Sequence, residues 1–210
     1  MARPVLYVLA GVNGAGKSSI GGHLLERLGL TWFNPDTFAR ELVATSGCDQ
    51  TTANAHAWTE SVRRLDEAIA GGHSHAFETT LGGHTVAARI AAAVRTHDVM
   101  MWFCGLASPD LHVARVRARV AAGGHDIPEA RIRERYPQAL QNLIALMPRL
   151  THLQVYDNSI EADMGSPISD PVLVLEMQDG HLVWPAADDV EALRRTPDWA
   201  KPLMEAALMG

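Results

Sequence analysis

Cysteine, lysine, aromatic residues and long apolar runs are all scarce in this chain of 210 residues. The two cysteines, Cys48 and Cys104, form no CxxC pair. This excludes a disulfide scaffold and favours a reduced, cytoplasmic setting in which both thiols are packing residues. No apolar run approaches the ~18 residues of a membrane-spanning helix. The apolar residues 5–10 end at Gly11 and are too few for a secretory signal, so we expect no membrane partner.

Positive charge is also limited, because 18 Lys and Arg face 24 Asp and Glu, for a formal net charge of −6. Duplex nucleic acid is held mainly by neutralisation of its phosphates, so this balance argues against a nucleic-acid partner. Only Lys17 and Lys201 are lysines, and all other basic residues are arginines. Codon bias accounts for the excess of arginine over lysine. Because lysine is so rare here, a lysine at a position that a motif requires is informative. The 47% hydrophobic content is that of a globular protein and excludes disorder.

Short apolar runs alternate with helical patterns along the first 160 residues. Strands are predicted at residues 5–10, 30–33, 74–78, 98–104 and 153–156, and helices at 18–28, after Asn34-Pro35-Asp36, and at 52–70, 86–95, 109–122 and 128–147. This alternation indicates a parallel sheet covered by helices on both faces. In the helix at 52–70, Trp58, Val62, Leu65 and Ile69 form one apolar stripe.

The last 40 residues follow a different pattern. Residues 172–177 and 181–184 flank Asp179-Gly180, a favoured hairpin turn, and a short helix and a polar end follow. We predict an α/β fold in one domain over residues 1–210. Its core spans residues 1–160, and residues 170–210 form a hairpin and helical tail at the sheet edge.

A phosphate-binding loop follows the first strand. Gly11-Val12-Asn13-Gly14-Ala15-Gly16-Lys17-Ser18 matches GxxxxGK[ST] and opens a predicted helix, which makes the fold a P-loop NTPase. Backbone N–H groups of such a loop surround phosphate oxygens, and its lysine reaches the β- and γ-phosphates. We assign ATP rather than GTP as the nucleotide, because no NKxD motif indicates guanine. Mg²⁺ is the second cofactor that we assign. The nucleotide-binding residues are Asn13, Gly14, Ala15, Gly16, Lys17, Ser18 and Ser19, and the Ser18 hydroxyl is a predicted Mg²⁺ ligand.

Two carboxylates follow predicted strands. Ligands of open α/β sheets lie at the carboxyl ends of the strands, so Asp36 and Glu78 should border the phosphate site. Asp36 is our candidate base for deprotonating an acceptor hydroxyl; its alternative role is a plain helix cap. Glu78 is a candidate for holding Mg²⁺ or binding the acceptor, and its alternative role is also a cap. Glu78, Thr79 and Thr80 form a polar cluster at the end of the strand. We therefore place Asp36, Glu78, Thr79 and Thr80 at the site that binds the acceptor.

Six arginines lie within 21 residues, on both sides of Gly123-Gly124-His125-Asp126-Ile127-Pro128; they are Arg115, Arg117, Arg119, Arg131, Arg133 and Arg135. Arginines beside a mobile hinge suit a lid over residues 119–136 that neutralises charge on a transferring phosphate. The alternative is two solvated helix faces. The ten histidines form no zinc ligand set, and His125 in the hinge is the one we would test.

At these residues the chain resembles the zeta-toxin family of P-loop kinases, especially its uncharacterised bacterial members. The likeness covers nearly the whole sequence. Its main stretches are 10–19, Asn34-Pro35-Asp36 with Ala39, 77–81, Arg115-Val116, Arg119-Val120, 123–125 with Pro128, Ile132, Arg135-Tyr136, Asp157-Asn158-Ser159 and the hairpin.

The resemblance implies a nucleotide-kinase-like core with the first strand central. It further implies an ATP-dependent phosphotransferase in which Asp36 deprotonates the acceptor, Glu78 binds it and lid arginines assist transfer. We select Lys17, Asp36, Arg119 and Arg135 as catalytic. In zeta toxins the acceptor is the 3′-hydroxyl of a UDP-linked N-acetylamino sugar, and an antitoxin protein blocks the ATP site.

Three functions stay open at this point. The first is a small-molecule kinase. The second is a nucleotide-binding regulatory module without transfer, which would not need the acid Asp36 beside the γ-phosphate. The third is a toxin whose partner is an antitoxin. A polynucleotide kinase is disfavoured by the negative charge and by the lack of a strip of aromatic and basic residues.

Overall fold

A six-stranded sheet forms the centre of the molecule. The computed structural model describes residues 2–18, 21, 25, 29–160 and 170–210. The strands are β1 (Val5–Ala10), β2 (His75–Thr79), β3 (Asp98–Gly105), β4 (His152–Asp157), β5 (Val172–Gln178) and β6 (His181–Trp184). Their order in the sheet is β2-β1-β3-β4-β5-β6. Strands β2, β1, β3 and β4 are parallel, and β5 and β6 are antiparallel to their neighbours, so the predicted hairpin extends the edge of the main sheet.

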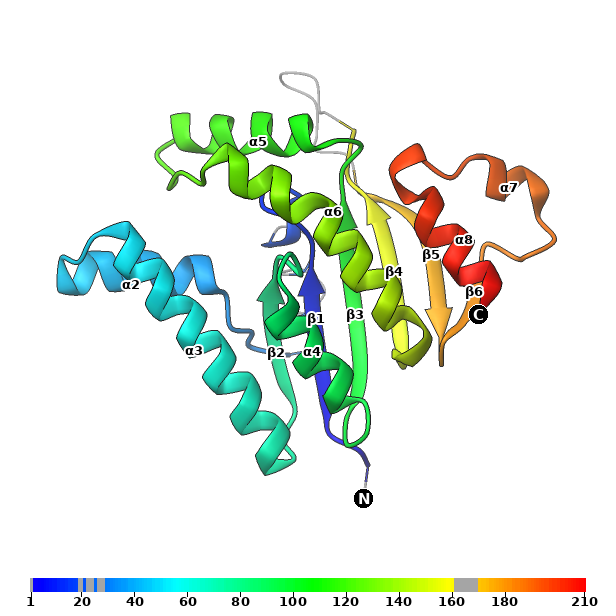
Figure 1. Ribbon diagram of the computed structural model, residues 1–210, viewed down its shortest axis with the longest axis horizontal. Coiled ribbons are helices and arrows are strands. Elements are labelled where there is room, and N and C mark those ends of the chain that lie inside the picture. Colours follow the sequence, from blue (N-terminus) through cyan, green and yellow to red (C-terminus); the bar gives the residue numbers. More distant parts are fainter. Residues whose placement is uncertain (1, 19–20, 22–24, 26–28, 161–169) are drawn as a thin grey trace.

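Helices connect and cover the strands. They are α2 (Pro35–Ser46), α3 (Gln50–Gly71), α4 (His84–Ala93), α5 (Pro109–Ala121), α6 (Glu129–Leu146), α7 (Val190–Arg194) and α8 (Lys201–Met209), with 3₁₀ turns at Met147–Arg149 and Asp198–Ala200. Helices α4, α6 and α8 lie on one face of the sheet, α2 and α3 form an arm beside β2, and α5 crosses the end of the sheet where β1 and β3 finish (Figure 1). The described part of the chain has no helix long and apolar enough to cross a membrane.

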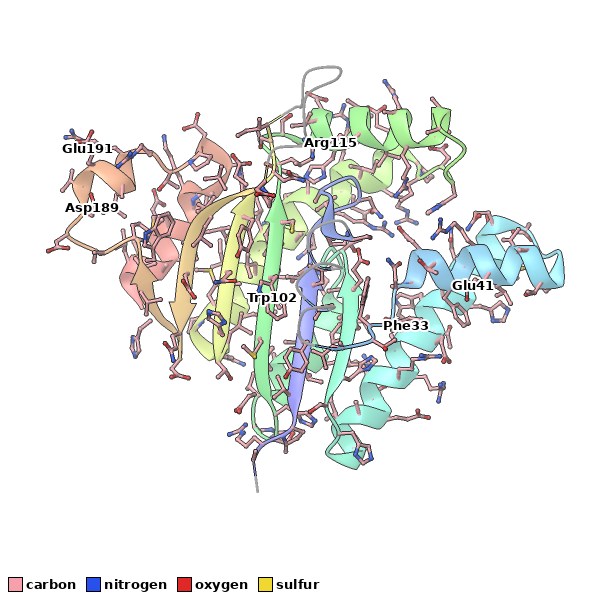
Figure 2. All side chains as sticks on the ribbon, turned by 180° about the vertical axis from the view of Figure 1, so that it is seen from behind. Phe33, Glu41, Trp102, Arg115, Asp189 and Glu191 are labelled. Carbon is pink, nitrogen blue, oxygen red and sulfur yellow. The ribbon has the colours of Figure 1, made fainter. Side chains whose placement is uncertain are left out.

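The other face of the sheet carries Trp102, whose ring stacks at 6.4 Å on Tyr7 (Figure 2). Leu25 belongs to the same apolar cluster, and a Cβ added to Gly21 would lie 1.9 Å from Leu9 Cδ2. The predicted helix at 18–28 lies largely outside the described residues, although Lys17, Ser18, Gly21 and Leu25 are helical.

The predicted strand at 30–33 is wrong, because only Phe33 pairs, in one parallel bridge with Phe77. Pro35 begins α2 two residues later, and Thr31 is exposed, so the segment is too short to extend the ladder. The stripe predicted on residues 52–70 is also partly wrong, because Trp58 is 54% exposed. Helix α3 instead buries small residues, among them Ala53 and Ala57, which let it pack closely on α2.

The end predicted to be polar is instead a helix, α8, which buries one apolar face. Leu203, Met204 and Ala207 of α8 join the main core, and Trp199 packs on the strand at Gly105, where an added Cβ would lie 2.1 Å from its ring. The Trp199 indole N–H also donates to Asp157 Oδ1 at 3.2 Å. Apolar contact and this hydrogen bond thus fix the tail to β3 and β4.

Candidate functional site

The loop after β1 has the backbone that its glycines allow. Gly14 and Gly16 both have φ of +85°, a region that other residues rarely adopt. A Cβ on Gly16 would lie 2.4 Å from Asn158 Nδ2. That amide donates to the carbonyl of Ala15 at 2.9 Å and so holds the loop from the end of β4. The loop is therefore shaped for backbone contacts with a ligand. Ser19, the last predicted nucleotide-binding residue, lies outside the described residues.

Asn13 joins this loop to both helices that lie above it. Its carbonyl accepts from His112 Nδ1 of α5 at 2.9 Å, and its side-chain oxygen accepts from Arg135 Nη1 of α6 at 2.7 Å. His112 is 1% exposed, and burial lowers its pKa to about 4, with the positive charges of Lys17 and Arg115 acting in the same direction. The imidazole is thus neutral at pH 7, with its proton on Nδ1. Burial also lowers the pKa of Arg135.

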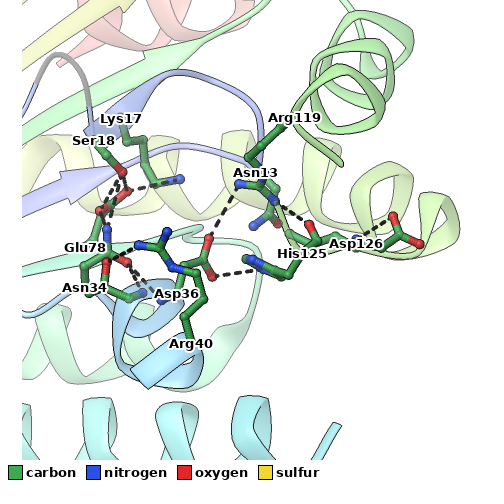
Figure 3. Close-up of polar contacts among 12 residues, drawn as sticks. Asn13, Lys17, Ser18, Asn34, Asp36, Arg40, Glu78, Arg119, His125 and Asp126 are labelled. Carbon is green, nitrogen blue, oxygen red and sulfur yellow. Dashed lines mark hydrogen bonds and ion pairs between the residues drawn. The ribbon is translucent and has the colours of Figure 1, made fainter. Parts of the chain in front are cut away.

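Glu78 lies at the carboxyl end of β2, against the loop, and is 5% exposed. Lys17 Nζ is 3.7 Å from its Oε1, and the Ser18 hydroxyl donates to the carboxylate at 3.2 Å (Figure 3). Asn34 also donates to it through Nδ2. The strand-end rule thus brought together residues 60 positions apart in the sequence. The Glu78 carboxylate does not act as the cap predicted as its alternative role, because the groups that contact it are the side chains of Lys17, Ser18 and Asn34.

A hydroxyl and a carboxylate at this distance are the hard oxygen donors that Mg²⁺ prefers. Ser18 and Glu78 therefore fit the predicted metal role. Within the residues that the structure describes, no group of three or more His, Cys, Asp or Glu could hold a metal ion. A cation here would take its other ligands from phosphate and water, as Mg²⁺ usually does.

Asp36 is not the cap of the helix that it begins. Asn34 caps α2, because its Oδ1 accepts from the backbone N–H groups of Asp36 and Thr37 at 2.9 and 3.2 Å. The Asp36 carboxylate is left free, 44% exposed, and faces Arg119 Nη1 at 3.9 Å and His125 Nε2 at 3.8 Å (Figure 3). The structure thus removes the plain-cap alternative for Asp36.

The six arginines differ in their contacts and fall into three groups. Arg119 faces Asp36, and Arg135 contacts Asn13. By contrast, exposed ion pairs with acids of α5 and α6 engage Arg117, Arg131 and Arg133. The solvated-face alternative therefore describes these three, which contribute little to stability. Arg115 donates to the carbonyl of Ile160.

Thr79 and Thr80 shape the turn after β2. Their hydroxyls accept from the N–H groups of Leu81 at 3.1 Å and Gly82 at 3.4 Å, and Leu81 has a φ of +53°. Asn142 of α6 donates to the carbonyl of Leu81 at 2.7 Å. These contacts give both threonines a structural role; acceptor binding by them stays a prediction.

The sequence alone predicts no role for His112, Asn34 or Asn158. Asn34 and Asn158 had a signal, since Asn-Pro at a helix start favours a cap and Asn158 follows a strand. His112 had none, because a histidine inside a helix does not reveal which loop it supports.

Comparison with known proteins gives a family and a fold. A family model described as an AAA domain matches residues 6–138. A comparison with curated proteins found no match. Among solved structures, a chain of the AvrRxo1-ORF1:-ORF2 complex with ATP is similar, with a TM-score of 0.64 and 16% identity. The match covers 94% of this chain and 64% of that one, so this chain spans less than two thirds of its length.

A structure from the PezAT chromosomal toxin-antitoxin system of Streptococcus pneumoniae is also similar, with a TM-score of 0.55 and 16% identity over 75% of this chain and 68% of that one. Identities this low establish the fold alone. The phosphate loop, the parallel strands and these likenesses agree on a P-loop NTPase fold. The family match covers more than half of the sequence, and the chain belongs to this AAA-domain family.

Proposed function

We propose that the protein is an ATP-dependent phosphotransferase that moves the γ-phosphate of ATP to a hydroxyl acceptor. One observation carries the proposal. Because Asn34 caps α2, the Asp36 carboxylate is not used as a helix cap, and it faces the lid residue Arg119 beside the phosphate loop. A module that only binds nucleotide has no use for such an acid. Asp36 would accept the hydroxyl proton as the acceptor oxygen bonds to phosphorus and the bond to the ADP oxygen breaks.

Positive groups would stabilise the charge of the transferring phosphate. Lys17 is 9% exposed at the base of the loop, and Arg135 is held above it on Asn13. Arg119 approaches from the last turn of α5. Mg²⁺ held by Ser18 and Glu78 would neutralise charge on the β- and γ-phosphates. The contacts of Glu78 with Lys17 and Ser18 favour this metal role over acceptor binding.

We further propose that residues 1–210 act as one domain, with a lid within 119–136. Within the lid, α6 is held over its first two turns, because Ile132 is 1% exposed and Arg135 packs on Gly82. Movement would therefore concentrate between Arg119 and the start of α6.

A screen of ATP consumption tests this function. Purified protein with Mg²⁺ and ATP would be offered UDP-linked N-acetylamino sugars first, as the zeta-toxin resemblance suggests, and then nucleosides, sugars and aminoglycosides. Asp36→Asn keeps the size of the side chain and removes the basic carboxylate. With the acceptor that is found, we expect ATP binding to persist and transfer to fall ~10²–10⁴-fold. Transfer at the wild-type rate in Asp36→Asn would refute the assignment of the base.

A second candidate function is that of a toxin with an antitoxin partner. The likeness to a structure from the PezAT toxin-antitoxin system favours it. Induced expression in bacteria tests it, because toxicity that depends on transfer should vanish in Asp36→Asn at equal protein level. Equal growth inhibition by both proteins would contradict a toxic phosphotransferase.

A further inference from the structure

We infer that His125 is a positioning residue for Asp36, an inference that rests on the proposed function. The imidazole Nε2 faces Asp36 Oδ1 at 3.8 Å, while Arg119 faces Oδ2 at 3.9 Å. The side chain of His125 is only 11% exposed, although it lies in a loop. A shortening of about 1 Å would turn this approach into a hydrogen bond.

The turn after α5 aims the imidazole at Asp36. Arg119 Nη2 donates to the carbonyl of His125 at 3.3 Å, and the backbone N–H of Gly124 donates to the carbonyl of Arg119 at 2.9 Å. A Cβ on Gly124 would lie 2.7 Å from Arg119 Cγ, so the turn closes tightly around the arginine. Gly123 before it has a φ of +89°. His125 and Arg119 therefore form one unit that meets the carboxylate from two sides.

The two partners of Asp36 differ in charge, and this difference gives His125 its role. An arginine that turns to a phosphate leaves the carboxylate, because charge-assisted bonds to phosphate are strong. Burial lowers the pKa of His125 against the raising effect of Asp36, and the nearby charges of Arg119 and Arg40 lower it further, against the small raising effect of Asp126. A neutral imidazole would remain beside Oδ1 and keep Oδ2 directed at the acceptor. Because it carries no positive charge, it would not disfavour transfer of the acceptor's proton to Asp36.

Enzyme kinetics in two backgrounds test the inference, with water as the acceptor and ADP release from Mg²⁺-ATP as the measurement. His125→Ala should lower kcat about 10- to 100-fold, the range of a lost hydrogen bond to a charged group, and leave KM for ATP within about twofold. His125→Gln, which places a donor near Nε2, should restore most of the rate. His56→Ala, an exposed histidine of α3, is the matched control.

The Asp36→Asn background separates positioning from general damage. There, His125→Ala should change kcat less than about twofold, because the carboxylate that it positions is absent. An equal loss in both backgrounds, or a rise in KM for ATP at constant kcat, would overturn the inference.

Histidine titration by NMR gives a readout that needs no turnover. The His125 signal is the one lost in His125→Gln, and its pKa should fall in Asp36→Asn, since the carboxylate raises it. An unchanged pKa would overturn the pairing whatever the kinetics show. A falling pKa in a protein that transfers phosphate to none of the offered hydroxyl acceptors would refute the proposed function and leave the pairing of His125 with Asp36 intact.

Discussion

The buried imidazole of His112 should make the stability of the fold depend on pH. His112 is 1% exposed, donates to the Asn13 carbonyl at 2.9 Å, and contacts the Tyr136 ring edge-on at 5.5 Å. Burial lowers its pKa from 6.5 to about 4. Between these pH values the unfolded chain binds a proton that the folded protein refuses. Stability is therefore complete above pH 6.5 and is lost as the pH falls towards 4.

The size of the effect follows from the two pKa values. At ~1.36 kcal/mol per pH unit, the interval between 6.5 and about 4 corresponds to about 3 kcal/mol of the free energy of unfolding. That is a large share of the stability of a domain, which is typically ~5–15 kcal/mol. The burial of His112 beside the phosphate loop therefore carries a cost that appears in acid.

Urea denaturation at several pH values between 7.5 and 4 measures the effect. His112→Asn keeps a donor near the position of Nδ1 but cannot titrate in this range. The variant should be less stable than the wild type at pH 7.5, and the two free energies of unfolding should converge as the pH falls. Other histidines and carboxylates cancel in the difference. A difference that stays constant from pH 7.5 to 4 would refute the reasoning.

Three further predictions concern the site. Lys17→Ala should abolish tight ATP binding in calorimetry; equal binding would remove the basis of the nucleotide assignment. Gly82→Ala places a Cβ 2.5 Å from Arg135 Cγ and should slow transfer, whereas Gly83→Ala, with open space around its Cβ, should not; equal rates would contradict a fixed Arg135. In hydrogen exchange, the part of the proposed lid before α6, residues 119–128, should become protected with an ATP analogue and Mg²⁺, and equal protection in both states would refute the lid.

Local patterns predicted the loop and most of the sheet well. The phosphate loop is a motif of eight consecutive residues, whose glycines and lysine together are typical of phosphate binding. It could therefore be predicted from a single contiguous stretch of sequence. The strand-end rule also brought Glu78 to Lys17, because the carboxyl ends of parallel strands meet at one edge. The bridge at Phe33 shows where this reasoning fails, since composition does not reveal how many residues a nearby helix start leaves for pairing.

The contacts that orient the site were harder to predict. Whether Asn34 or Asp36 caps α2 depends on a shift of two residues, and both types favour caps. The role of the base depends on that choice. His112 is a residue of α5 with no neighbouring motif, and only the placement of α5 over the loop shows that it holds Asn13. Tertiary packing, which one sequence alone does not specify, decides such contacts.

Arg119 and Arg135 looked equivalent in the sequence, one on each side of the hinge, but the structure holds them differently. Arg135 lies on α6, which is fixed by Ile132 in the core and by Asn142 on the turn after β2. Arg119 is held by the backbone of one turn and by an ion pair at 3.9 Å. A charge fixed in place can stabilise a transition state without reorganising, whereas a charge at the end of a helix, beside a mobile turn, can arrive with the ligand. We therefore propose that Arg135 would contact a bound phosphate in every state and that Arg119 would contact it only after the turn closes.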